Sequence, residues 1–228
     1  MKDQDRLFWN AQQKQLRSSL AHEDTYPEAL TLFLHQHAMV HAASLTPDEP
    51  MHFQEPVLSG LSETQWRTIL PKGEHSMVWI FWHLARIEDM TMNGLLAGDT
   101  QLFIKENWSS RLRISVMDSG NSMPLDEVRL ISDSMDISAL LAYRNAVALR
   151  TREIVSNMDS AQLKKRVQSE RLHQLLNEGA VRHAAIGLIE YWGALKYSGL
   201  LLMPPTRHNF AHINEARLLK EKLLKMRV

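Results

Sequence analysis

Apolar residues recur three or four positions apart along most of this chain, which is the spacing of one face of an α-helix. The pattern predicts helices over residues 27–45, 76–96, 136–158, 160–178, 181–191, 195–203 and 207–226. No stretch shows the apolar and polar alternation of β-branched residues that is typical of strands. The sequence therefore predicts an all-α protein.

The boundaries of these helices follow from breakers and caps. Residues 46–75 hold half of the prolines and form a long connection, with one short helix over 62–70 that Ser62 and Gln65 start as a capping box. Gly98 is expected to end the helix over 76–96. Pro204 and Pro205 disfavour helical backbone before them, so Thr206 is expected to be the N-cap of the last helix.

Composition narrows the possible chemistry. The 228 residues contain 26 Lys and Arg, 26 Asp and Glu, 11 His and no Cys, so the formal net charge is zero. A protein without a basic surplus is not expected to bind nucleic acid. The absence of cysteine excludes disulfides, thiolate metal sites and a cysteine nucleophile. The most apolar run, 200–204, is much shorter than the roughly 20 residues of a membrane span, so we expect a cytoplasmic protein without a membrane segment.

Two histidine pairs have i, i+4 spacing, namely His37 with His41 and His208 with His212. On a helix, such residues lie on one face about 5–6 Å apart at Cβ, so that both imidazoles can bind one cation. Glu215 follows His212 by three residues and is a candidate fourth ligand, hydrogen-bond acceptor for a ligand, or general base. The first pair has no carboxylate close by in sequence, and a partly buried cluster at a helix end is its alternative interpretation.

His83 is the best candidate for a third ligand. It lies among bulky apolar residues, where a core histidine with satisfied hydrogen bonds is the alternative. Arg86 shares its helix face and is expected either to bind a substrate anion or to pair with Glu190 or Glu215. The acidic residues 88–89 point away from His83 and are expected to lie in solvent or to support the fold.

Two segments together resemble the DinB-like superfamily, namely 82–89, WHLARIED, and 206–215, TRHNFAHINE. The resemblance implies a four-helix bundle whose metal site takes one His from the second helix and an HxxxH pair from the last. His83, His208 and His212 match these three ligand positions. It also implies one domain over 1–228 with its core at about 28–226, extra short helices, and connections at 46–75 and 97–135 that are longer than in compact members.

The resemblance further implies a divalent-metal-dependent enzyme, since characterised relatives are transferases or isomerases that use low-molecular-weight thiols. We expect a transferase that uses such a thiol or a hydrolase, with Glu215 and Arg86 as candidate catalytic residues. Zinc or nickel is the expected ion, and an all-histidine site also accepts iron or manganese. Because the chain has no cysteine, a thiol has to arrive as a small molecule.

A different class of function stays open. The alternative is a non-catalytic helical bundle whose metal site is vestigial or regulatory. In either case the expected partner is a small molecule, together with a second copy of the chain in a homodimer. Trp192 and Tyr197 are candidate residues for that dimer interface.

Overall fold

Helices account for the regular structure of residues 3–226, which the computed structural model describes; an isolated β-bridge joins Arg166 to Lys196. The α-helices are α1 Asp3–Ser19, α2 Tyr26–Met39, α3 Gln54–Leu58, α4 Glu63–Arg67, α5 Met77–Asp89, α6 Leu102–Lys105, α7 Trp108–Leu112, α8 Leu125–Ser134, α9 Ile137–Ser156, α10 Ser169–Asn177, α11 Gly187–Ala194, α12 Tyr197–Leu202 and α13 Asn209–Leu223. Two π-helices, Met90–Ala97 and Met203–His208, and three short 3₁₀ turns complete them. The predicted all-α fold is confirmed.

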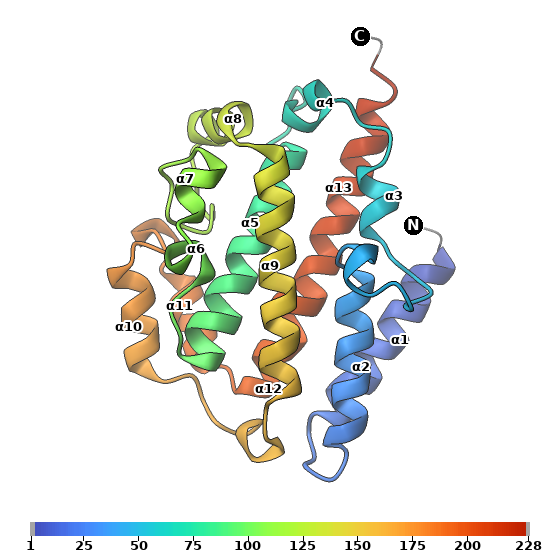
Figure 1. The fold of residues 1–228 in the computed structure, drawn as a ribbon, viewed down its shortest axis with the longest axis vertical. Helices are drawn as coiled ribbons and strands as arrows, with labels where there is room; N and C mark the ends of the chain where they lie inside the picture. Colours follow the sequence, from blue (N-terminus) through green and yellow to red (C-terminus); the bar gives the residue numbers. More distant parts are fainter. Residues whose placement is uncertain (1–2, 227–228) are drawn as a thin grey trace.

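Four of these helices form the bundle that carries the candidate site. In Figure 1, α2, α9, α5 and α13 run side by side along the long axis of the molecule. α5 packs against both α9 and α13, and α2 packs against α9 and against the π-helix that precedes α13. The shorter helices α6 to α8, α10 and α11 lie on the α5 side, away from α2, whereas α12 lies at the lower end of the bundle and contacts α1. None of the helices described for residues 3–226 is both long and apolar enough to cross a membrane.

Several predicted boundaries are confirmed by their hydrogen bonds. Ser62 and Gln65 form the expected capping box at the start of α4, and Asp136 accepts from the Ala139 backbone N–H at the start of α9. The helix that begins at Met77 continues through the first π-helix and ends at Gly98, whose φ of 70° is left-handed. These signals are local in sequence, which is why the sequence reveals them.

The predicted start of the last helix is wrong. The chain does not begin a new helix at Thr206, because α12, the π-helix Met203–His208 and α13 follow one another without a break. Pro204 and Pro205 occupy the first turn of the π-helix and offer no N–H to the carbonyls of the turn before it. The Thr206 hydroxyl donates backward, to the carbonyls of Leu201 at 3.1 Å and Leu202 at 3.0 Å, instead of capping.

Three other expectations also differ from the structure. The predicted helix over 160–178 is broken, and α10 begins only at Ser169. α1 was not predicted, although it packs on α2 and its Trp9 stacks on Phe210 with ring centroids 4.2 Å apart. Trp192 and Tyr197 are buried within the chain, so they offer little surface to a dimer interface.

The interior is divided by a buried polar layer. One apolar cluster surrounds the α4 end of the bundle and a second surrounds the α12 end. Between them, α2, α5, α9 and α13 place charged and polar side chains that are buried almost completely, namely His37, His41, His83, Arg86, Glu88, Asp89, Tyr143, Arg144 and Asn209. Since burying such groups is unfavourable unless they are paired, their partners determine what this layer does.

Gly120 fixes a loop against α5, and we expect Gly120→Ala to destabilise the protein by about 1–3 kcal/mol. Its φ is 83°, and an added Cβ would lie 2.7 Å from Trp82 Cζ3 and 3.0 Å from Trp79 Cζ2. Gly179→Ala is the matched control, because Gly179 has a φ of 68° with nothing within 4 Å of its added Cβ. Urea unfolding of both variants should show a larger loss for Gly120→Ala. Equal losses would mean that contact with the two tryptophans contributes nothing.

Candidate metal centre

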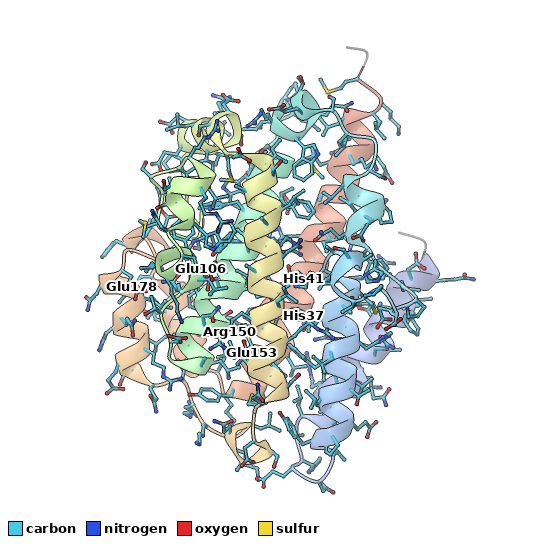
Figure 2. The ribbon with its side chains drawn as sticks, viewed as in Figure 1. His37, His41, Glu106, Arg150, Glu153 and Glu178 are labelled. Atoms are coloured by element: carbon cyan, nitrogen blue, oxygen red, sulfur yellow. The ribbon has the colours of Figure 1, made fainter. Side chains whose placement is uncertain are left out.

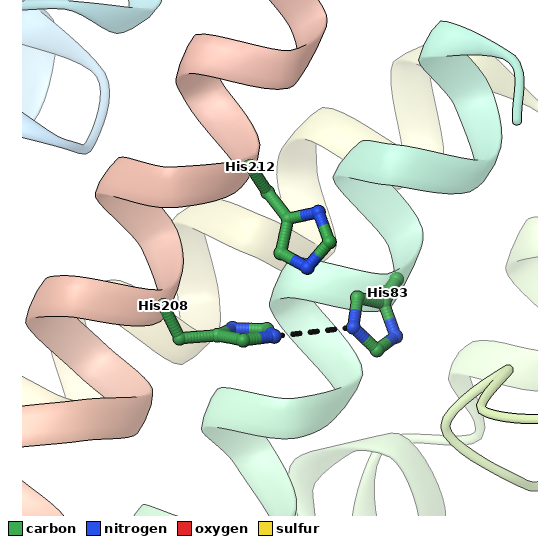
Figure 3. A group of neighbouring side chains, drawn as sticks. All are labelled: His83, His208 and His212. Atoms are coloured by element: carbon green, nitrogen blue, oxygen red, sulfur yellow. Dashed lines mark hydrogen bonds between the residues drawn. The ribbon is translucent and has the colours of Figure 1, made fainter.

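Two helices bring the three predicted ligands together. α5 contributes His83, the last residue of the second π-helix is His208, and α13 contributes His212 one turn later. Their imidazoles converge between α5 and α13, with ring centroids 4.6–5.0 Å apart (Figure 3). One nitrogen from each ring lies within 4.8 Å of the others. The geometry is that of a candidate three-histidine metal site, and the ligand role of the residues stays a prediction.

Hydrogen bonds on the far side of two rings fix which nitrogen faces the centre. His83 Nδ1–H donates to the Ser119 carbonyl at 2.5 Å, and His212 Nδ1–H donates to Glu215 at 2.6 Å. Because these oxygens only accept, neutral His83 and His212 each carry their lone pair on Nε2. Metal-binding histidines are oriented by the same kind of bond from the other ring nitrogen.

The spacing of the nitrogens fits a bound cation. His83 Nε2 and His208 Nε2 lie 3.1 Å apart. Two nitrogens that bind one tetrahedral zinc ion at 2.0–2.1 Å each would be about 3.3 Å apart. His208 Nδ1 is buried without a hydrogen-bond partner, so the proton of neutral His208 is best placed on Nε2, where His83 Nε2 accepts it. A divalent cation would replace this proton and bind both Nε2 atoms.

Burial favours the neutral form of two of the three ligands. It lowers the pKa of His83 to about 3 and the pKa of His208 well below its ordinary value, with the neighbouring imidazoles adding to the effect. Burial raises the pKa of Glu215, but hydrogen bonds from His212 and His75 outweigh it and lower the pKa to about 2. At neutral pH the site therefore offers the neutral imidazoles of His83 and His208, together with His212 and the carboxylate behind it, which is a donor set suited to a dication.

A cavity of about 770 Å³ opens onto the three histidines. Its wall comes from α5, the loop 120–123, α8, α11, the second π-helix and α13. His75 stacks on Trp79 with ring centroids 3.6 Å apart, and Trp79 stacks on His83 at 4.7 Å, so an aromatic column leads from the cavity to the ligand. The volume lies in the range of small-molecule sites.

Glu215 holds His212 in place, and we expect Glu215→Gln to weaken metal affinity about 10–100-fold. Its two carboxylate oxygens accept from His212 and, at 2.8 Å, from His75 Nδ1. A neutral amide is a weaker acceptor, and it makes His212 a poorer ligand. Competition with a chelator measures the change. Glu221→Gln on the same helix is the control, because Glu221 pairs with Arg217, and equal affinities in the two variants would contradict the role of Glu215.

Arg86 does not make either of the expected contacts with Glu190 or Glu215. Its guanidinium is fully buried and donates to Tyr143 Oη at 3.1 Å, Gln101 Oε1 at 2.9 Å and the Met117 carbonyl at 2.6 Å. It has turned toward α9 and the loop before α8 and away from the ligands, which is a contact pattern that supports the fold.

The acidic pair after His83 is buried as well, so the expectation that it lies in solvent is wrong. Asp89 accepts from Tyr143 at 2.6 Å and from the backbone N–H groups of Leu102 and Phe103. It lies 3.6 Å from Arg86. Its role in supporting the fold, which was the other expectation, is confirmed by these contacts.

The pair His37 and His41 meets a carboxylate that sequence spacing does not reveal. His37 lies in the last turn of α2 and His41 just after the end of that helix, both at the side that faces the bundle interior (Figure 2), and their Nε2 atoms lie 2.9 Å and 3.1 Å from the oxygens of Glu88 on α5. Asn209 Nδ2, next to His208, donates to the same carboxylate at 2.8 Å. The cluster lies at a helix end, as the alternative interpretation expects, but it is fully and not partly buried.

This second cluster is also a geometric candidate for a metal, but its charges favour a hydrogen-bonded network. Burial raises the pKa of Glu88, and the two imidazoles outweigh it and hold the pKa well below its ordinary value. Glu88 is therefore an anion that already accepts from His37, Asn209 and His41. Arg144, also fully buried, donates to Asn209 and supplies the balancing positive charge. A dication would add unbalanced charge to this interior.

The second cluster predicts acid sensitivity of the metal-free protein. Burial lowers the pKa of His41 to about 3, whereas an unfolded histidine has a pKa of about 6.5. Below pH 6.5 the unfolded chain therefore binds a proton that the folded chain excludes, and stability falls by roughly 1.4 kcal/mol per pH unit for this residue. Urea unfolding between pH 7 and 5 measures the slope. We expect a shallower slope in His41→Asn, and an unchanged slope would contradict this assignment.

The middle of the chain matches a known protein family. A family model described as the DinB superfamily matches residues 54–186, which is more than half of the chain. The matched segment contains His83, whereas His208 and His212 lie beyond its end. No curated protein matches the chain.

Proposed function

Since the chain belongs to the DinB superfamily, we propose that it is a metal-dependent transferase that uses a low-molecular-weight thiol. The observation that carries the proposal is the convergence of three imidazoles on a cavity of about 770 Å³. In this proposal His83, His208 and His212 hold a divalent ion, with zinc or nickel first and iron or manganese as alternatives. A divalent ion bound there would lower the pKa of a thiol or water in its open coordination position.

The surroundings of Glu215 favour a thiol over hydrolysis. Both of its oxygens accept from imidazoles, so it orients His212 and does not present a free base to a water molecule. A thiol needs less help, because it ionises more easily than water. The chain contributes no sulfur of its own, so the cavity has to admit the thiol together with its electrophilic co-substrate.

The aromatic column and the carboxylate argue against a vestigial site. A bundle that has lost its metal has no need of a carboxylate that accepts from both His212 and His75, or of a cavity beside three converging imidazoles. We also propose that the protein is cytoplasmic and forms a homodimer; size-exclusion chromatography with light scattering measures the oligomeric state.

A small neutral thiol tests the proposal. Protein loaded with Co²⁺ should gain a sulfur-to-metal charge-transfer band when 2-mercaptoethanol is added, and His212→Ala should not show it. A wild-type spectrum that stays unchanged at saturating thiol would overturn the thiol assignment. Metal-dependent hydrolysis of a panel of esters and amides by the same preparation would then support the hydrolase alternative.

A further inference from the structure

We propose that the thiol carries an apolar, uncharged body, so that the cavity selects hydrophobic thiols and excludes thiols with several negative charges. This inference rests on the proposed thiol transferase and adds its substrate class. It comes from the apolar side chains that line the same cavity as the three histidines.

Three elements line the cavity with apolar side chains. α8 contributes Leu125 and Val128, α11 contributes Leu188 and Tyr191, and the second π-helix contributes Met203. These side chains come from three separate elements and face one space, so a ligand that reaches the histidines has to contact them. Burying an apolar group against such a wall is favourable, whereas burying an unpaired charge there is not.

The charged groups of the wall point to the same substrate. Among the described residues that line the cavity, none is Lys or Arg, and Glu74 is the one carboxylate. Arg182, on the connection between α10 and α11, is already bound to Asp118 and Glu127. A carboxylate on the substrate would therefore find no cation on the wall. A metal ion at the histidines would pair with the thiolate, which leaves no partner for a second anionic group.

The mouth of the cavity is apolar as well. Leu125 is 40% exposed and Tyr191 is 43% exposed, although both are large side chains that are usually buried in a soluble protein. Since both line the cavity, they extend its apolar wall to the surface. A hydrophobic substrate would cover them on binding.

A series of thiols that share one sulfur and differ in the tail tests the inference. Isothermal titration of zinc-loaded protein with propane-1-thiol, butane-1-thiol and hexane-1-thiol should show affinity rising about fourfold with each added methylene. 6-Mercaptohexanoate, in which a carboxylate replaces the terminal methyl group of hexane-1-thiol, should bind more weakly than hexane-1-thiol. Equal affinities along the series, or tighter binding of 6-mercaptohexanoate, would overturn the inference and leave the proposed function standing. If none of these thiols binds, both fail.

A charge placed on the wall provides the matched comparison. Leu188→Lys should weaken hexane-1-thiol and strengthen 6-mercaptohexanoate, because the new ammonium disfavours an apolar tail and pairs with the carboxylate. Leu218→Lys is the control, since Leu218 is exposed on α13 and is not part of the cavity wall. The same change of preference in both variants, or in neither, would overturn the assignment of the apolar tail to this wall.

Discussion

Replacing His208 with alanine is expected to remove stoichiometric metal from the protein, with a loss of affinity greater than 100-fold. Losing a residue that only orients a ligand costs about 10–100-fold, so losing one of three ligands should cost more. His208 Nε2 lies 3.1 Å from His83 Nε2, and no other ring nitrogen or carboxylate belongs to that group in the described residues except that of His212. Two imidazoles alone would hold a divalent ion weakly.

Metal analysis of protein purified without a histidine tag measures this loss. The wild type should hold one ion per chain, and His83→Ala should behave as His208→Ala does. His22→Ala is the control, because His22 is exposed in the connection between α1 and α2. Equal metal content in the wild type and His208→Ala would refute the assignment of the site. Two ions per chain would show that the cluster of His37, His41 and Glu88 also binds metal.

Replacing Arg144 with methionine is expected to destabilise the protein by about 3–5 kcal/mol. Its guanidinium donates to Gln54 at 2.8 Å, Asn209 at 3.0 Å and the Val40 carbonyl at 2.7 Å. Methionine fills much of the space, so most of the loss comes from leaving the Glu88 anion without a balancing charge in the interior.

Arg150→Met on the same helix provides the comparison for Arg144. Arg150 is 30% exposed and pairs with Asp99 and Glu153 near solvent, where such ion pairs contribute about 0–1 kcal/mol. Urea unfolding of both variants should separate them clearly. A loss below about 1 kcal/mol for Arg144→Met would mean that the buried network does not stabilise the fold.

The accuracy of the sequence predictions follows the range of the interactions involved. The helix that carries His83 was predicted because its N-cap, apolar stripe and terminal Gly98 all lie within 23 residues of one another. The pair His208 and His212 was recognised for the same reason. α1 was missed because what stabilises it is remote, as in the stacking of Trp9 on Phe210.

The roles of charged residues in the interior were not predictable from spacing. Glu88 is more than 40 positions from His37 and His41 in sequence, and the fold alone brings it to them. Arg86 lies on the same helix as His83, yet its partners Tyr143 and Gln101 come from other elements. Sequence spacing identifies which residues share a helix face, whereas the neighbours of that face depend on how the helices pack.

The π-helical turn between α12 and α13 sets the rotational phase of the metal-binding motif. A π-helix has one residue more in its hydrogen-bonded turn than an α-helix, and here that turn runs from Met203 to His208. Deleting one residue from it would rotate everything downstream by about 100° around the helix axis. His208 and His212 would keep their four-residue spacing while facing away from His83. An intact HxxxH sequence is thus not sufficient for a metal site in this fold. Deleting one residue upstream of the motif would abolish metal binding without changing the motif itself.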